Sequence, residues 1–286
     1  MIDIIHEFQF PGRTGAFLNL DQGLGVAAFF VVIGYEFLLW VYFLLIKFRE
    51  TKKMYWMYYS LFFFFIVISQ SIFILYDYFM PYFIEVVRAN PLFPVFIFRI
   101  ANFIGWLALA TMVGILATLV FTENDKKSNI LRIISPIVII AIGSAFLWLP
   151  DNSILDENYF LYSDPYGMEY NITLPINATQ SPWPGLGMGV FILNLVLTPI
   201  FSFFMPFIFL YLAYRSVGLI RKSSALNGIG FLAYWVGKFS KYYFAISKNP
   251  RTGLPWTGLT QNVWPALIIL LGLLCLALAN MMIQQK

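Results

Sequence analysis

Glu36, Lys238 and Lys241 are charged residues that stand well inside apolar stretches long enough to cross a membrane. A charged side chain is unfavourable among lipid tails, so an ionisable residue in a membrane span usually faces a protein interior or a wet cavity. At a rise of about 1.5 Å per residue, Glu36 and Lys238 fall within a side chain's reach in depth. The spacing therefore suggests an ion pair between these two residues.

Each polar residue of the predicted spans also has a simpler interpretation. The two lysines can extend to the outer headgroups, with Glu36 neutral or hydrogen-bonded to a neighbouring helix. Arg99 and Asn102, near the outer end of the third predicted span, can line the same outer cavity as the lysines or serve as interfacial anchors. Asn194 and Asn280 are expected to form hydrogen bonds between helices.

Composition places the chain in the membrane class. Of its 286 residues, 11% are charged and 60% are hydrophobic, with a mean hydropathy of +0.77. Soluble globular domains average about 25% charged residues. Several apolar runs reach the roughly 20 residues that a helix needs to cross the hydrocarbon layer. We therefore predict an all-α, multi-pass protein of the cell membrane, with residues 1–286 forming a single domain in the lipid bilayer.

The apolar runs predict a bundle of seven transmembrane helices separated by polar or proline-rich loops. The sixth run is diluted by its lysines and glycines. The longest polar segment, the loop 151–185, holds five acids and neither lysine nor arginine. The predicted spans cover residues 23–46, 54–78, 96–121, 130–149, 187–214, 223–247 and 263–282.

Lysine and arginine residues predict the orientation, because cytoplasmic flanks of membrane spans carry an excess of both. Ten of them lie in or beside the loops after the first, third and fifth predicted spans, against four on the opposite side. The N-terminus is therefore predicted outside and the C-terminus in the cytoplasm. Two glycosylation sequons, at Asn171 and Asn177, fall in the loop that this topology places outside, where N-linked glycans are attached.

The residue inventory excludes several kinds of catalytic and metal site. The only histidine is His6, in the N-terminal arm, and the only cysteine is Cys275, in the last apolar run. These two residues cannot build a bis-histidine haem site, a histidine-rich zinc centre or a metalloprotease helix. The last predicted span also lacks the lysine expected of a retinal protein resembling the rhodopsins. We expect no metal, no cofactor, no nucleic-acid partner and no enzymatic activity.

The sixth predicted span and its basic lead-in carry a family resemblance. Arg221 and Lys222 precede a glycine-rich helix in the stretch RKSSALNGIGFLAYWVG, residues 221–237. This junction resembles one in uncharacterised prokaryotic, especially archaeal, seven-span sensor-like proteins and in the seven-span input domains of some histidine kinases. The resemblance covers one helix and its lead-in, and it implies a sensory function. Because the sequence ends at Lys286 without a kinase output domain, signalling is expected to pass through a separate cytoplasmic partner.

Two functions are compatible with these residues. The first is a receptor-like or sensory membrane protein, with an outward-facing cavity lined by Arg99, Lys238 and Lys241 that would suit an anionic or amphipathic small-molecule ligand. The second is a transporter, or a non-catalytic subunit of a membrane complex, in which Glu36 and Lys238 form part of an ion or proton path. Transport requires an aqueous route to both faces, whereas a receptor requires only the outward cavity. The resemblance favours the receptor-like function.

Overall fold

The computed structural model describes residues 7–9, 17–79, 86, 90, 92–121, 126–154, 187–246 and 258–282 of the chain. Within these residues the protein is all-α, as predicted, apart from one short antiparallel pair of strands, β1 (Glu7–Gln9) and β2 (Phe17–Asn19). Phe8 pairs with Leu18 at the centre of this ribbon. Strand β2 leads directly into the first helix.

The first helix continues past its predicted end. It runs through α1 (Leu20–Val41), the π-helical stretch η1 (Tyr42–Phe48) and α2 (Arg49–Thr51), and it ends at Lys52, which has a φ of 56°. The remaining described helices are α3 (Met54–Ile74), η2 (Leu75–Phe79), α5 (Phe93–Val120), α6 (Lys126–Gly143), α7 (Ala145–Trp148), η4 (Asp151–Ser153), α9 (Met188–Val190), η5 (Phe191–Leu197), α10 (Thr198–Arg215), α11 (Gly218–Ile246) and α12 (Gly258–Met282).

Six helical stretches of the described chain are long and apolar enough to cross a membrane. They correspond to every predicted span except the sixth, and they support a multi-pass membrane protein. Large apolar side chains are exposed along them, for example Ile133 and Ile137 of α6 and Phe204 and Phe207 of α10. Exposed apolar surface of this extent is typical of helices that face lipid. The six stretches are Gly23–Thr51, Met54–Ile74, Phe93–Val120, Lys126–Trp148, Met188–Arg215 and Val263–Met282.

The seventh long helix is α11, which coincides with the sixth predicted span but is less apolar than the other six. Its 29 residues are ample for a bilayer, since a crossing takes about 20 residues. Lys238, Lys241 and several serine, asparagine and glycine residues lower its hydropathy. A two-residue turn joins it to α10, and Gly218, with a φ of 64°, begins it. The described residues thus form six strongly apolar long helices and one more polar one, where the sequence predicted seven spans.

The chain divides into two compact units, with boundaries inside the first and fifth long helices. The first unit comprises Met1–Arg13, Phe17–Leu39 and Ser202–Lys286, and the second comprises Thr14–Ala16 and Trp40–Phe201.

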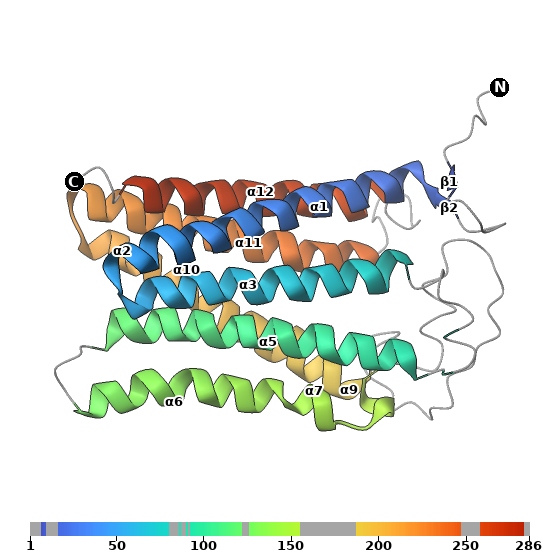
Figure 1. Ribbon diagram of the computed structural model, residues 1–286, viewed down its shortest axis with the longest axis horizontal. Helices are drawn as coiled ribbons and strands as arrows, with labels where there is room; N and C mark the ends of the chain where they lie inside the picture. Colours follow the sequence, from blue (N-terminus) through green and yellow to red (C-terminus); the bar gives the residue numbers. More distant parts are fainter. Residues whose placement is uncertain are drawn as a thin grey trace. The chain divides into compact units, whose positions relative to one another are not determined.

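In the first unit, α11 packs closely along α12, and the two helices run in opposite directions (Figure 1). Glycines make this approach possible, because small residues at a helix interface let the two backbones come together. A Cβ atom at Gly272 would lie 2.7 Å from the carbonyl oxygen of Gly230 and 2.7 Å from the amide nitrogen of Tyr234. On α10, Phe209 stacks on Phe231 with ring centroids 5.9 Å apart, so α11 also contacts α10.

In the second unit, α3, α5 and α6 lie side by side in chain order (Figure 1). Tyr58 occupies the space beside Gly114, and Trp106 occupies the space beside Gly143. The Ser69 hydroxyl donates a hydrogen bond of 2.8 Å to the carbonyl oxygen of Ala101, which links α3 to α5. Aromatic side chains fill the interface between η1 and α3, where the Phe43 and Phe63 rings stack 5.7 Å apart.

Replacing Gly272 by alanine should separate α11 from α12. The added methyl group would meet backbone atoms that cannot move independently, so we expect a loss of about 1–3 kcal/mol in the free energy of unfolding. Gly34→Ala in α1 is the matched control, since nothing lies within 4 Å of its Cβ position. Reversible unfolding in mixed micelles, followed by circular dichroism, measures both changes. Equal effects of the two substitutions would contradict the close packing at Gly272.

Candidate functional site

The first unit brings together the three intramembrane charges that the sequence singled out. Glu36, on α1, is completely buried, with an exposed fraction of 0%. On α11, Lys238 is half-buried and lies within electrostatic range of both Glu36 and Lys241. We call these three residues the charged cluster. It has one acid on α1 and two bases, three positions apart, on α11.

Aromatic rings contact both lysines of the charged cluster. The Lys238 Nζ lies 5.4 Å from the ring centroid of Trp235, and the Lys241 Nζ lies 4.7 Å from that of Phe29. Both distances are within the range of about 6 Å in which a cation is attracted to the face of a ring. Phe29 and Glu36 are seven positions apart on α1, so they share a face of that helix. One face of α1 therefore meets the lysine-bearing face of α11.

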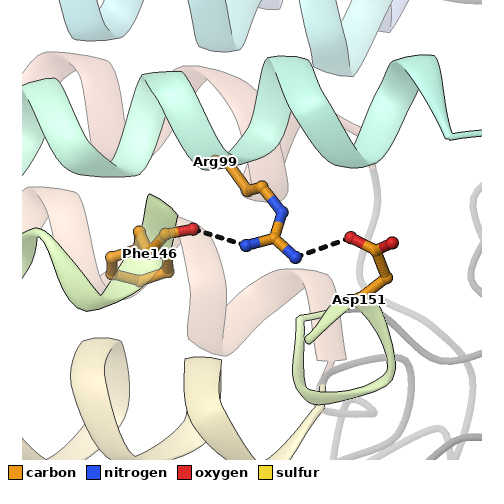
Figure 2. A network of polar contacts seen from close by, with 3 residues as sticks. All are labelled: Arg99, Phe146 and Asp151. Atoms are coloured by element: carbon orange, nitrogen blue, oxygen red, sulfur yellow. Dashed lines mark hydrogen bonds and ion pairs between the residues drawn. The ribbon is translucent and has the colours of Figure 1, made fainter. Parts of the chain in front are cut away.

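Arg99 and Asn102 belong to the second unit, whereas the charged cluster belongs to the first. Figure 2 shows Arg99, on α5, between Phe146 of α7 and Asp151. Its Nη2 lies 2.6 Å from Asp151 Oδ1, and its Nη1 donates a hydrogen bond of 2.7 Å to the carbonyl oxygen of Phe146. The planar guanidinium group suits two such partners, because its donors are held in a fixed fork. Asp151 therefore anchors the start of the long polar loop to α5.

The two ends of this loop meet beside the Arg99 contact. The amide nitrogen of Gly187 donates a hydrogen bond of 3.0 Å to the carbonyl oxygen of Ile154, a residue that is itself buried. A side chain at position 187 would collide with the backbone of Ser153, so only glycine fits there. The loop is thus closed at its base. Residues 155–186, with the sequons at Asn171 and Asn177, lie outside the described residues.

Asn102 is buried, and its side chain connects two helices. Its Nδ2 donates a hydrogen bond of 2.8 Å to the carbonyl oxygen of Phe98 on the same helix, α5. Its Oδ1 accepts a hydrogen bond of 2.5 Å from the Nδ2 of Asn194, in η5. The prediction that Asn194 forms an interhelical hydrogen bond is confirmed. Asn102 is its partner, so the described polar contacts of Asn102 hold two helices together.

A second amide network joins α11 to α12 in the first unit. The Ser223 hydroxyl donates to the carbonyl oxygen of Ala279 over 2.9 Å. Asn280 donates from Nδ2 to Asn227 Oδ1 over 3.4 Å and to the carbonyl oxygen of Leu276 over 2.7 Å. The interhelical role predicted for Asn280 is confirmed, but Asn227 and Ser223 were not predicted. Ser223 and Asn227 are four positions apart, a spacing that places both on one face of a helix. This spacing could have indicated a shared polar contact with a neighbouring helix.

Lys47 lies in a helix, whereas the sequence predicted it in a loop. The sequence assigned it to a loop that begins after residue 46, yet it lies within η1 with an exposed fraction of only 5%. Its Nζ is 5.4 Å from the ring centroid of Trp56 and 5.8 Å from that of Tyr42. These rings attract the ammonium group and shield it from water. The helix therefore continues past a lysine that would otherwise mark its end.

Sequence reasoning also missed the partners of the candidate site residues. Asp151 is the ion-pair partner of Arg99, and its position directly after Pro150, which ends the fourth predicted span, was a usable signal. Trp235 precedes Lys238 by three positions, a spacing that places both on one face of a helix. Among the described residues, no group of three or more histidine, cysteine, aspartate or glutamate side chains is arranged to hold a metal ion.

The Arg99–Asp151 pair is expected to contribute modestly to stability. In a double-mutant cycle with Arg99→Gln and Asp151→Asn, we expect a coupling energy of about 1 kcal/mol or less, because exposed ion pairs are screened by solvent and Asp151 is 39% exposed. Thermal unfolding in detergent measures the four variants. A cycle that combines Arg99→Gln with Glu50→Gln, on α2, is the control and should show no coupling. Equal coupling in the two cycles would contradict the ion pair.

Comparisons with known proteins do not place the chain in a family. No protein-family model matches it, and neither the curated proteins nor the solved structures gave a match. The function is therefore inferred from the geometry of the two polar sites.

Proposed function

We propose that the protein crosses the membrane seven times, with α11 as the sixth span in chain order. Helix α10 belongs to one of the six apolar stretches, and only two residues separate its end from the start of α11. Helix α11 then packs backbone to backbone against α12, which forms another apolar stretch. The excess of lysine and arginine beside the loops after the first, third and fifth spans supports a cytoplasmic C-terminus and an external N-terminus.

We further propose that the protein is an ion- or proton-coupled transporter, or a non-catalytic subunit of a membrane complex, with the charged cluster at its centre. One observation supports this proposal above all: Glu36 is completely buried and lies within electrostatic range of Lys238. Ionisable residues inside membrane spans typically mark ion pathways and proton relays. A buried ion pair is a poor device for stability alone, because its desolvation offsets most of its attraction. The closeness of these opposite charges on α1 and α11 is therefore more readily explained by function.

The contacts of Arg99 favour the ion-path hypothesis over the receptor-like hypothesis. The receptor-like hypothesis placed Arg99 beside the lysines in one outward cavity. In the structure Arg99 is engaged by Asp151 and by the carbonyl oxygen of Phe146, within the second unit. The charged cluster, in contrast, contains the Glu36 and Lys238 groups that the ion-path hypothesis requires.

A receptor-like or sensory function is the second candidate, and the anchored loop favours it. Asp151 fastens the start of the loop to α5, and the hydrogen bond between Gly187 and Ile154 closes its base. In the proposed topology this loop lies outside, so a small molecule bound there could move α5 directly. A separate cytoplasmic partner would then detect the movement, as the resemblance at residues 221–237 implies.

Two-sided labelling of single cysteines distinguishes these functions. Cysteines replace Glu36, Lys238 or Lys241 in a Cys275→Ala background, and sealed vesicles of known orientation are treated with an impermeant thiol reagent from each side. An ion path predicts labelling of position 36 from the cytoplasm and of position 238 from outside, because water must reach the cluster from both faces. A receptor predicts labelling of positions 238 and 241 from outside only, with position 36 protected.

The control for this experiment is Val32→Cys, one turn from Glu36 on α1 and completely buried. It should not be labelled from either side. Absence of cytoplasmic labelling at all three cluster positions would contradict the transport proposal. Absence of labelling from both sides would contradict both proposals, since each requires water or a ligand to reach the lysines.

A further inference from the structure

The connection between α10 and α11 carries three basic side chains. Arg215 is the last residue of α10, and Arg221 and Lys222 lie near the start of α11. All three are exposed, and in the described part of the chain none of them takes part in an ion pair. We call residues 214–222 the hairpin tip.

The described acids of the first unit lie far from the hairpin tip. Residues 170–286 contain no aspartate or glutamate, so these acids belong to β1 and α1. Glu36 lies within electrostatic range of Lys238, which is sixteen positions and therefore about 24 Å along the α11 axis from Lys222. Because α1 runs antiparallel to α11 at their contact, Asp21 lies farther still from the tip. The tip is a positively charged surface of this unit.

Aromatic and apolar side chains are exposed among these bases. The exposed fraction is 84% for Val217, 81% for Tyr214 and 67% for Ile220. Residue 215 also ends the apolar stretch 188–215, so the tip lies where the hydrocarbon layer meets the lipid headgroups. At that depth tyrosine rings are common, and apolar side chains can enter the upper acyl region. Long basic side chains extend from there to the headgroups.

Local hydrogen bonds hold the hairpin tip in shape. The amide nitrogen of Ser216 donates a hydrogen bond of 3.0 Å to the carbonyl oxygen of Leu212. The Nε of Arg215 donates a hydrogen bond of 3.2 Å to the hydroxyl of Tyr211, and its Cζ lies 5.8 Å from the centroid of that ring. Among the described residues this bond engages Nε alone, so the two Nη groups of the oriented guanidinium can contact an anion.

We propose that the hairpin tip binds the phosphate of an anionic phospholipid through Arg215, Arg221 and Lys222. Guanidinium groups match phosphate oxygens with two parallel donors. A lipid fits the tip better than a soluble acidic protein, because the exposed apolar side chains lie at headgroup depth among the bases. In the proposed topology this leaflet is the cytoplasmic one, which has a negative surface potential. The site is separate from the charged cluster and goes beyond the proposed function.

Competition between two lipids tests the proposal. The purified full-length protein in detergent micelles is titrated with phosphatidylglycerol or phosphatidylcholine of the same acyl chains, and native mass spectrometry measures the bound fraction. We expect tighter binding of phosphatidylglycerol, which should also raise the midpoint of thermal unfolding, because a ligand of the folded state stabilises it. This rise should shrink between about 0.1 M and about 1 M salt, because the Debye length falls from about 10 Å to about 3 Å.

Three variants assign the binding to the hairpin tip. Arg221→Gln combined with Lys222→Gln should weaken the affinity for phosphatidylglycerol by about tenfold or more, because two attractive charges are lost. Val217→Glu keeps every base but adds an acid among them, so it should also weaken the affinity. The matched control combines Lys53→Gln with Lys126→Gln, which removes two exposed bases of the second unit. This control should bind as the native chain does.

Unfolding midpoints in phosphatidylcholine alone show whether the variants fold, and they should not change because the substituted side chains are exposed. Equal affinity for the two lipids would overturn the proposal. Equal losses in the tip and control variants would overturn it too, because they indicate general attraction to a basic protein. Displacement of the lipid by glycerol phosphate would assign the tip to a free phosphate. Tip-dependent binding of polyglutamate without a lipid preference would assign it to an acidic protein, and either result contradicts a lipid site.

Discussion

The carboxylate of Glu36 imposes the strongest single constraint on this structure. A group that is completely shielded from solvent must be balanced by nearby positive charge or by hydrogen-bond donors. Lys238 is within electrostatic range of Glu36, and Lys241 contacts the Phe29 ring of α1, so α11 keeps one polar face toward α1. This requirement explains why α11 is the least apolar of the long helices. Close backbone contacts with α12 hold it in place.

Polar residues elsewhere in the helices serve mainly to join neighbours. The Asn102–Asn194 pair links two helices of the second unit, and Ser223, Asn227 and Asn280 link α11 to α12 in the first. These groups are neutral, and hydrogen bonds within the bundle satisfy most of their polar atoms. The charged cluster differs, because ionisable side chains rather than neutral amides and hydroxyls lie together in it, and one of them, Glu36, is completely buried. That difference separates a structural network from a candidate ion site.

The sequence predicted the positions of the long helices and the depth of charged residues along them. It did not predict which side chains of different helices contact each other. Apolar length alone located six of the seven long helices, and the positions of Glu36 and Lys238 along their helices suggested their encounter. The partner of Arg99 is 52 positions away in sequence and that of Asn102 is 92 positions away. Such pairings depend on how each helix is rotated about its axis, which hydropathy does not record. Lys47 was misplaced because aromatic rings of another helix shield it.

Whether Glu36 and Lys238 interact inside the folded protein is measured most directly by a double-mutant cycle on these two residues. Glu36→Gln, Lys238→Gln and the double variant are compared with the native chain by reversible unfolding in mixed micelles. Each single substitution leaves one charge without its counter-charge, whereas the double variant removes both charges. We expect a coupling energy of about 2 kcal/mol, less than the 3–5 kcal/mol that removing one partner of a fully buried pair costs, because Lys238 is only half-buried. Additive effects, within about 0.5 kcal/mol, would contradict it.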